Sequence, residues 1–322
     1  MCANARLSLL IWLLLVILAL PRTSSASIGE CTNTTTRVEW RQLSSVDQQQ
    51  YIDSVLCLKT KPSRIGLNSS LYDDFTFVHF TLNNQIHSSA VFLPWHRYFT
   101  FLYTGAIRDC GYKGPMTYWD WTLDLLKMLQ SQVMASELGF GGTGSRNRTK
   151  QMPDEAAPFY CVDDGPFWQL RPSCRISLGN RLKFDEHCLH RDVQERSDSY
   201  SGSKIANILQ ERDFLWFSRR LETSPHNTIH STIGGEMGPP TSPNDPLFFL
   251  HHSQIDRLWW LWQQMNLTAR YNDYSGDVRN SNGSYSDMQA SLSDLLQMNG
   301  LAPDISVKEI MNVSSPPWCY QY

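Results

Sequence analysis

The segment from residue 221 to residue 262 reads LETSPHNTIHSTIGGEMGPPTSPNDPLFFLHHSQIDRLWWLW and contains four of the nine histidines of the chain. His226 and His230 are four residues apart. On a helix they would therefore lie on one face, one turn from each other. This spacing suits two imidazoles that bind the same metal ion. The segment therefore predicts a helix that presents two histidines to a metal.

A second helix is predicted in the same segment. Asp245 is a favourable N-cap and Pro246 a favourable first helical residue, so the helix should begin there and run through the tryptophan-rich part to Trp262. His252 and Asp256 are four residues apart on it. One helix would thus supply a third ligand and, close to the same face, a carboxylate.

The N-terminus has the features of a signal peptide. Arg6 precedes an unbroken apolar run from Leu9 to Leu20, and the small residues Ser24, Ser25 and Ala26 follow. This pattern predicts a signal peptide at residues 1–26. The alternative is a membrane anchor, but the run falls short of the roughly 20 residues that span a bilayer. We therefore expect a secreted protein that has no membrane segment once the signal is removed, with one domain at residues 27–322.

Composition narrows the classes of partner. The chain has 322 residues, 41% hydrophobic content and a formal net charge of −3. No basic run stands out, which argues against nucleic acid as a partner. Six Asn-x-Ser/Thr triplets agree with the secretory route. They begin at Asn33, Asn68, Asn147, Asn266, Asn282 and Asn312.

Seven cysteines remain after loss of the signal. In a secreted chain they predict up to three disulfides and one free thiol, with the pairing left open. A zinc cluster is the alternative for His187-Cys188-x-His190 with Cys161 and Cys174 nearby. Disulfides explain cysteines in a secreted protein better. The seven are Cys31, Cys57, Cys110, Cys161, Cys174, Cys188 and Cys319.

Apolar periodicity predicts further helices. They cover residues 37–58, 73–82, 91–110 and 202–221, with a short one near 292–298. Asn83-Asn84 is expected to end the helix at 73–82, so that a loop carries His87. Gly- and Pro-rich composition predicts loops at 60–70 and 137–166.

A second set of histidines precedes the first along the chain. His79, His87 and His96 are spaced eight and nine residues apart. A single buried histidine is usually a core residue, but two three-histidine sets are a stronger signal. All-imidazole sets suit Zn, Cu, Fe or Ni. Since no cysteine joins either set and no Glu-x-x-His motif accompanies them, structural zinc and a carboxylate di-iron site are disfavoured. Two neighbouring metals could orient one substrate between them.

Several motifs, in order, resemble the tyrosinase and catechol oxidase family of type-3 binuclear copper proteins, and among them the short fungal-type members. They are FLPWHR at 92–97, YWDW at 118–121, PHNxxH at 225–230, GG at 234–235 and NDPxFxxHHxxxDR at 244–257. The resemblance covers roughly residues 37–265. It implies a mainly α fold, with a four-helix bundle around two copper ions that bind O2, long loops and little β structure.

The resemblance also implies roles for individual residues. His79, His87 and His96 would ligate the first copper, and the second copper would be ligated by His226, His230 and His252. The family uses the second member of the His-His pair, which places His251 in the wall of the site. Arg97 and Asp256 look like a buried ion pair that orients the two ligand helices. The alternative is a solvated surface pair.

Glu222 and Asn227 are candidate catalytic residues on the same resemblance. In the family such a pair can hold a water molecule that takes the proton from a monophenol, and that help requires a carboxylate within reach of the water. Glu222 could equally be a structural acid. Gln85 stands where many relatives have a cysteine that is cross-linked to the second ligand, so that thioether is not expected here.

The ending Tyr320-x-Tyr322 resembles the tyrosine motif that closes the catalytic domain in relatives. No C-terminal shielding domain is therefore expected, and the site should admit substrates larger than tyrosine. Side chains near the second copper, among them Ser231, Pro239 and Pro240, would select the substrate.

These observations predict a secreted copper oxidase that uses O2 to convert phenols, catechols or o-aminophenols to o-quinones. One alternative is a tailoring oxidase that applies this chemistry to a single natural product. An O2 carrier of the hemocyanin type is a second, weakened by the single small domain without a shielding segment. A metal-free binding protein is a third, disfavoured because all six ligand positions are filled.

Overall fold

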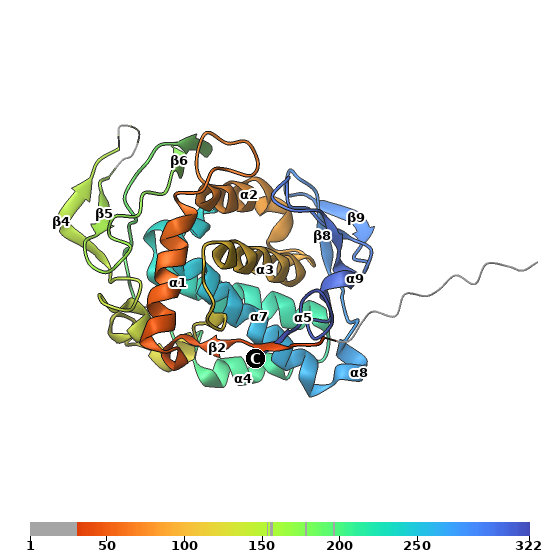
Figure 1. The fold of residues 1–322 in the computed structure, drawn as a ribbon. Helices are drawn as coiled ribbons and strands as arrows, with labels where there is room; N and C mark the ends of the chain where they lie inside the picture. Colours follow the sequence, from red (N-terminus) through yellow and green to blue (C-terminus); the bar gives the residue numbers. More distant parts are fainter. Residues whose placement is uncertain (1–30, 153, 155–156, 178, 196) are drawn as a thin grey trace, which may run out of the picture.

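The computed structural model describes residues 31–322 except 153, 155, 156, 178 and 196. The predicted signal peptide at residues 1–26 lies outside the described residues. The described part is mainly helical, as predicted, and β structure is limited to short two-stranded pairs (Figure 1). Its helices are α1 (Ser45–Leu58), α2 (Leu71–Ile86), α3 (Phe92–Asp109), α4 (Gly202–Leu209), α5 (Phe214–Leu221), α6 (Asn227–Ile233), α7 (Leu247–Met265), α8 (Leu267–Arg270) and α9 (Val307–Ile310).

Two of the strand pairs are parallel and four are antiparallel. The parallel ones join β1 (Thr35–Thr36) to β12 (Tyr320–Gln321) and β2 (Val38–Glu39) to β3 (Thr117–Tyr118). The antiparallel pairs are β4 (Gly144–Lys150) with β5 (Phe159–Val162), β6 (Cys174–Ser177) with β7 (Arg181–Phe184), β8 (Asp277–Arg279) with β9 (Tyr285–Gln289), and β10 (Leu295–Leu296) with β11 (Ile305–Ser306).

Helices α2, α3 and α7 form the centre of the molecule, with α1 crossing beside them (Figure 1). Their facing sides are aromatic. Phe75 of α2, Phe99 of α3 and Phe249 of α7 are buried and stack or meet edge to face. Such aromatic contacts add to the free energy gained from burial alone. This packing sets the distance between the helices that carry most of the histidines.

The predicted starts of two helices are nearly correct. Helix α7 begins at Leu247, and the Asp245 carboxylate accepts a hydrogen bond from the Leu247 N–H at 3.0 Å, as a capping side chain does. Helix α3 begins at Phe92 and ends at Asp109, and Gly111 has a φ of +101° just beyond its end. The glycine permits this left-handed turn, because a side chain there would be strained.

The prediction of a helix over residues 37–58 was wrong at its beginning. Helix α1 starts at Ser45, where the Ser44 side chain caps it by accepting from the Asp47 N–H. Residues Val38–Glu39 instead form a strand beside β3. Val38 and Glu39 therefore form backbone hydrogen bonds with a strand that is distant in the sequence. Apolar periodicity within one segment could not reveal that partner.

Asn83-Asn84 does not end a helix, contrary to the prediction. Helix α2 continues through both residues to Ile86, and His87 follows directly at its C-terminus. Buried Leu82 and Ile86 hold the last turn against the core. Tertiary burial therefore overrides the modest helix propensity of asparagine.

Three further predictions were wrong in part. The helix expected at 202–221 is broken between α4 and α5, where the Asp213 side chain caps the second piece. The loop expected at 137–166 contains the hairpin of β4 and β5, and the helix expected near 292–298 contains strand β10 instead. These pairings depend on partner strands whose register no local pattern encodes.

The cysteine prediction is confirmed. Disulfides join Cys31 to Cys319, Cys57 to Cys110 and Cys161 to Cys188, while Cys174 is buried with a free thiol. The alternative of a zinc cluster built on the cysteines is wrong. Cys161 and Cys188 form a disulfide with each other, so neither has a thiolate that could bind zinc.

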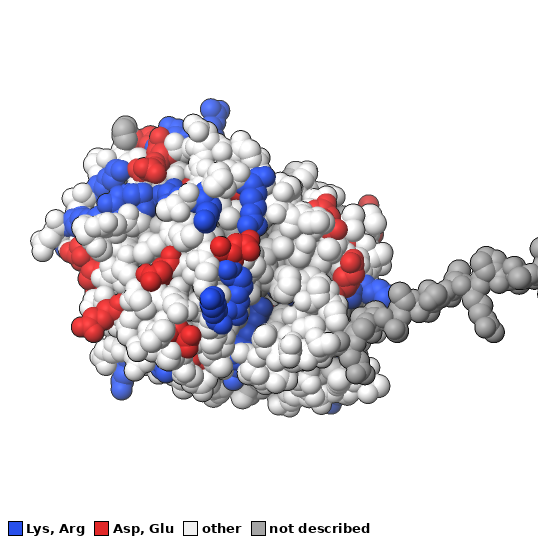
Figure 2. All heavy atoms as spheres, in the orientation of Figure 1, with Lys and Arg blue, Asp and Glu red and all other residues white. Residues whose placement is uncertain are grey.

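Figure 2 shows one face of the molecule, on which basic and acidic side chains are interspersed. Basic groups are most frequent over the part where Figure 1 places β4, β5 and β6. Within the described part of the chain, no helix combines the length and apolarity needed to span a bilayer.

Candidate metal centre

The first histidine set comes from α2 and α3. His79 lies in α2, His87 follows its last residue, and His96 lies in the second turn of α3. One ring nitrogen from each can be chosen so that all three atoms lie within 4.8 Å of one another. The structure thus brings together the three residues that the sequence assigned to one metal.

Backbone carbonyls orient these three rings. The Nδ1–H groups of His79, His87 and His96 donate to the carbonyls of Pro240, Asn83 and Phe92 at 2.7, 3.2 and 2.8 Å. A neutral ring whose Nδ1 carries the proton has a lone pair on Nε2. The Nε2 atoms of His79 and His96 are 3.4 Å apart, so two lone pairs face each other. A cation between them would relieve this contact, and the set therefore fits a metal ion.

The second set begins on a distorted helix. Residues Glu222–His226 form a π-helical turn that includes Pro225, and α6 follows from Asn227. π-Helical turns are rare and occur often at functional sites. His226 and His230 are on one face, with ring centroids 4.5 Å apart, as their spacing predicted. Their Nδ1 atoms donate to the Asn227 side-chain oxygen at 2.9 Å and to the Met237 carbonyl at 2.6 Å.

Helix α7 adds both members of the His-His pair. His251 and His252 are fully buried and lie within the same cluster as His226 and His230. The Nδ1 of His251 accepts a hydrogen bond from the Trp121 indole at 3.2 Å, whereas His252 has no hydrogen bond on either ring nitrogen. His252 also stacks on His96 of the first set, with centroids 4.3 Å apart. Both histidines thus join the second set, and the Nε2 of His251, like that of His252, is buried without a hydrogen bond. The assignment of His252 as the ligand and of His251 to the wall stays a prediction.

The two sets face each other in the interior. The ring centroids of His87 and His226 are 6.0 Å apart, and those of His96 and His226 are 6.3 Å apart. The Nε2 atoms of His226, His230 and His252 are buried without a hydrogen bond. An unpaired buried polar atom is costly, so these nitrogens indicate a missing partner. A metal ion bound by each set would supply it.

Burial keeps these imidazoles neutral. It is the main cause that lowers the pKa of His87 and His230 to about 4, and it lowers the pKa of His79, His96, His226 and His252 well below the usual 6.5. Neutral imidazole is the form that binds metals. The donor set is therefore ready for a metal at neutral pH.

The same pKa shifts predict how the metal-free protein responds to acid. A histidine that is neutral when folded, but titrates near 6.5 when unfolded, stabilises the fold less as pH falls below 6.5. We expect the melting temperature of the metal-free protein to fall steadily between pH 7 and pH 4. Thermal scans in a pH series would check this, and a constant or rising melting temperature over that range would contradict it.

A cavity of about 420 Å³ opens beside the histidines. It has the size of a small-molecule site. Its lining includes four of the histidines and the three side chains that the sequence nominated for substrate selection. The lining histidines are His79, His87, His226 and His230. The other predicted site residues that line the cavity are Glu222, Asn227, Ser231, Pro239 and Pro240.

Glu222 lines this cavity and is nearly buried. Its Oε1 accepts a hydrogen bond from the Ser88 N–H at 2.7 Å. Burial raises the pKa of the Glu222 carboxyl to about 7, which is the range where a general base is most effective. The Asn227 side-chain oxygen accepts a hydrogen bond from the His226 ring, so Asn227 also orients a candidate metal ligand.

The predicted ion pair between Arg97 and Asp256 is confirmed, and it is buried. The Arg97 Nε lies 2.5 Å from the Asp256 carboxylate, and both side chains are almost without exposure. The hydroxyls of Tyr320 and Tyr322 donate to the other carboxylate oxygen at 2.6 Å each. The pair joins α3 and α7, with Arg97 directly after His96 and Asp256 one turn after His252, so it fixes the helices that carry them.

Sequence reasoning missed the groups that orient the rings. The carbonyls of Met237 and Pro240 lie in the turn after α6 and hold one ligand of each set. A backbone carbonyl has no residue-type signature. Trp121, which engages His251, belongs to a recognised motif but had no assigned role.

Comparison with known proteins agrees with this arrangement. The family model for the common central domain of tyrosinase matches residues 69–265, which contain all six candidate ligands. The chain belongs to the tyrosinase family. It is therefore a copper oxidoreductase, and the tyrosinase fold implies a binuclear copper site that the two histidine clusters fit.

Two relatives of this tyrosinase-family chain are fungal proteins. It is 36% identical over 303 residues to the tyrosinase-like protein phomQ2 of Diaporthe leptostromiformis, covering 91% of this chain and 74% of the relative. It is 35% identical over 308 residues to tyrosinase ustQ of Aspergillus flavus, covering 93% and 82%.

A solved structure has the same fold. A polyphenol oxidase variant from Thermothelomyces thermophila superposes with a TM-score of 0.73 at 27% identity, covering 90% of this chain and 88% of that one.

Proposed function

We propose that this tyrosinase-family chain uses O2 to oxidise phenols, catechols or o-aminophenols to the corresponding o-quinones. The observation that carries the proposal is the pair of facing histidine sets, with buried, unpaired Nε2 atoms beside an open cavity. When bound, two copper ions would supply the redox chemistry with O2. His79, His87 and His96 would hold one copper, and His226, His230 and His252 the other.

The chain's own residues have distinct tasks in this proposal. Carbonyls and Asn227 fix the tautomers of the ligand rings, which keeps their Nε2 atoms free for metal. Ser231, Pro239 and Pro240 line the cavity that would receive a phenolic ring. Glu222 lines the same cavity with a carboxyl group poised to accept a proton.

The second candidate function is the oxidation of one dedicated substrate, and the names of some relatives favour it. One relative, 29% identical over 350 residues and covering 92% of this chain and 95% of the relative, is the N-acetyl-6-hydroxytryptophan oxidase ivoB of Emericella nidulans. That substrate name describes a hydroxylated aromatic ring with a larger substituent. The open cavity suits such a molecule as well as a simple phenol.

Secretion as a single domain at residues 27–322, after removal of residues 1–26, is part of the proposal. Three disulfides support it, because such bonds persist in oxidising compartments. N-terminal sequencing of the protein recovered from the medium of a eukaryotic host tests it. A retained leader, or product confined to the cells, would count against it.

The decisive experiment is O2 uptake by the purified, copper-loaded protein, with a monophenol compared with its matching catechol. Uptake with the catechol is the minimum that the proposal requires. Uptake with both would add monophenol hydroxylation. Absence of uptake with either, in protein that contains two copper ions, would reject a general phenol oxidase and leave the dedicated substrate or the O2 carrier.

Glu222→Gln separates the two reactions. If Glu222 is the base that removes the phenol proton, monophenol turnover should fall by at least about 10²-fold, as loss of a general base does. Catechol oxidation, measured on the same sample, should change much less. With a pKa of about 7, the wild-type monophenol rate should rise with pH through 7, and the variant should lose that rise. Equal losses for both substrates would assign Glu222 a structural role.

A further inference from the structure

A third cluster of metal-ligating side chains lies outside the copper centre. His187 and His190 follow β7, and Glu236 lies in the turn after α6. One ligand atom from each lies within 4.8 Å of the others. We propose that His187, His190 and Glu236 hold a third metal ion, a divalent ion of the zinc type. The proposal is independent of the phenol oxidase function.

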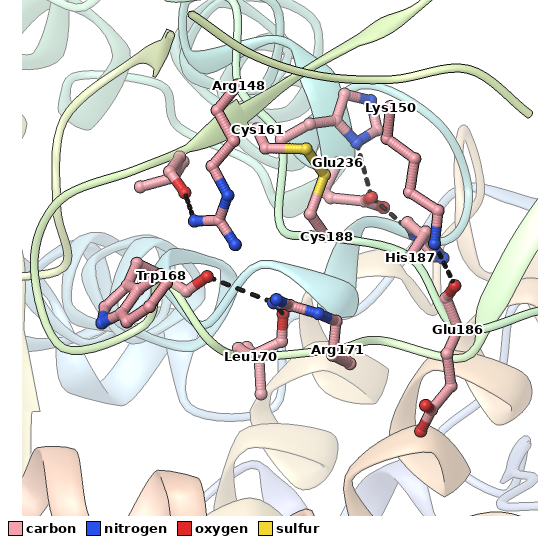
Figure 3. The surroundings of a disulfide bond; sticks show 12 residues. Arg148, Lys150, Cys161, Trp168, Leu170, Arg171, Glu186, His187, Cys188 and Glu236 are labelled. Atoms are coloured by element: carbon pink, nitrogen blue, oxygen red, sulfur yellow. Dashed lines mark hydrogen bonds and ion pairs between the residues drawn. A yellow bond between two sulfur atoms is a disulfide. The ribbon is translucent and has the colours of Figure 1, made fainter.

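The three side chains converge on one carboxylate oxygen. The Nε2 of His187 and the Nδ1 of His190 each lie 2.7 Å from the Glu236 Oε1 (Figure 3, where His187 and Glu236 are labelled). His187 and Glu236 are almost fully buried, with side-chain exposures of 1% and 3%, and His190 is 20% exposed. The cluster is therefore part of the interior with one edge open to solvent.

Outer groups hold these ligands as they hold the copper ligands. The Nδ1 of His187 donates to the Asp185 carbonyl at 2.9 Å, which directs its Nε2 at the Glu236 Oε1, 2.7 Å away. Asn244 donates to the second oxygen of Glu236 at 2.9 Å. The His190 ring stacks on Phe159, with centroids 4.2 Å apart and planes 2° apart. Partners of this kind orient first-sphere ligands in metal sites.

The backbone segments that carry the two histidines and Glu236 are held in place. Cys188, between the two histidines, is bonded to Cys161 (Figure 3). The Glu236 N–H donates to the His190 carbonyl at 3.0 Å. The adjoining Gly235 has a φ of +52°, and a Cβ there would lie 2.2 Å from that carbonyl oxygen. The close approach of the two segments thus requires glycine, and it places Glu236 against the histidines.

A His–Glu–His cluster held together by hydrogen bonds, without a metal, is the competing interpretation. The Nδ1 of His190 is buried and lies 2.7 Å from the Glu236 Oε1. Two histidines and one glutamate form a known zinc ligand set, with Zn–N and Zn–O distances of about 2.0–2.2 Å. Tetrahedral ligand atoms would then be about 3.3 Å apart, so the side chains must separate by about 0.6 Å.

The site would be connected to the copper centre through one turn. Glu236 precedes Met237, whose carbonyl orients His230, and the same turn continues to Pro240, whose carbonyl orients His79. An ion on Glu236 would therefore anchor the turn that positions one ligand from each copper set.

Metal stoichiometry tests the proposal. Copper-loaded protein is incubated with excess Zn²⁺, desalted and analysed for both metals. We expect two copper ions and one zinc ion per chain. His190→Ala and Glu236→Gln should each lose the zinc, and the control Glu186→Ala should keep it. Glu186 is a neighbouring carboxylate with a side-chain exposure of 67% that lies outside the cluster.

Two outcomes would overturn the proposal: no zinc in the wild-type protein, or equal zinc in the wild-type and His190→Ala proteins. Replacing Zn²⁺ with Co²⁺ gives an independent readout. Visible absorption of tetrahedral Co²⁺ should be present in the wild-type protein and the Glu186→Ala control and absent from His190→Ala. Each test compares the Zn²⁺ or Co²⁺ content of a variant with that of the wild-type protein. Poor copper loading common to both proteins would therefore not produce such a difference.

Discussion

The substitution His252→Ala is expected to remove about one copper ion per chain and to lower catechol oxidation by more than about 10²-fold. Loss of an outer partner of a metal ligand already costs about 10–100-fold, so loss of a ligand should cost more. Both ring nitrogens of His252 are buried without hydrogen bonds, so no hydrogen bond accounts for its position. Metal analysis and O2 uptake on the same preparation would check this.

His251→Asn is the matched control for this experiment. An asparagine retains a group that can accept the Trp121 N–H, which His251 accepts at 3.2 Å. Copper content should then remain at two ions per chain. Loss of copper from His251→Asn, with retention in His252→Ala, would reverse the assignment of the ligand within the pair.

Asp256→Ala should destabilise the fold by about 3–5 kcal/mol, because it leaves the buried Arg97 charge without its partner. Asp256 also receives hydrogen bonds from Tyr320 and Tyr322, and Arg37 approaches it at 3.4 Å. Urea unfolding of the metal-free protein, followed by tryptophan fluorescence, measures the change.

An exposed ion pair provides the comparison for Asp256→Ala. Arg64 and Asp109 lie 2.9 Å apart with side-chain exposures of 46% and 69%. Asp109→Ala should cost at most about 1 kcal/mol, as exposed pairs do. Similar losses for the two substitutions would show that the buried pair has no special role in holding α3 and α7 together.

Spacing along single helices made much of the histidine arrangement predictable. The His226/His230 and His252/Asp256 spacings depend only on the helical repeat, and both pairs lie as expected. The motif around His96 placed α3 to within one residue at its start. These features are local, so the sequence contains all the information that they need.

Features that depend on distant segments could not be predicted in this way. The pairing of six of the seven cysteines, the strands β4 and β5, and the continuation of α2 through Asn83 each depend on tertiary contacts. Glu236 shows the same limit. It is 46 residues from His190 in the sequence, and only the fold reveals that they are in contact.

The structure around Asp256 also constrains when this protein can mature. Its partners come from both ends of the described chain: Arg37 near the beginning, and Tyr320 and Tyr322 at the end, which lies beside β2 (Figure 1). The first and last strands pair, and Cys31 and Cys319 are bonded. During synthesis a ribosome must therefore release residue 322 before α3 and α7 gain their final contacts. The contacts that fix the two histidine-bearing helices therefore cannot be complete until residue 322 has been synthesised.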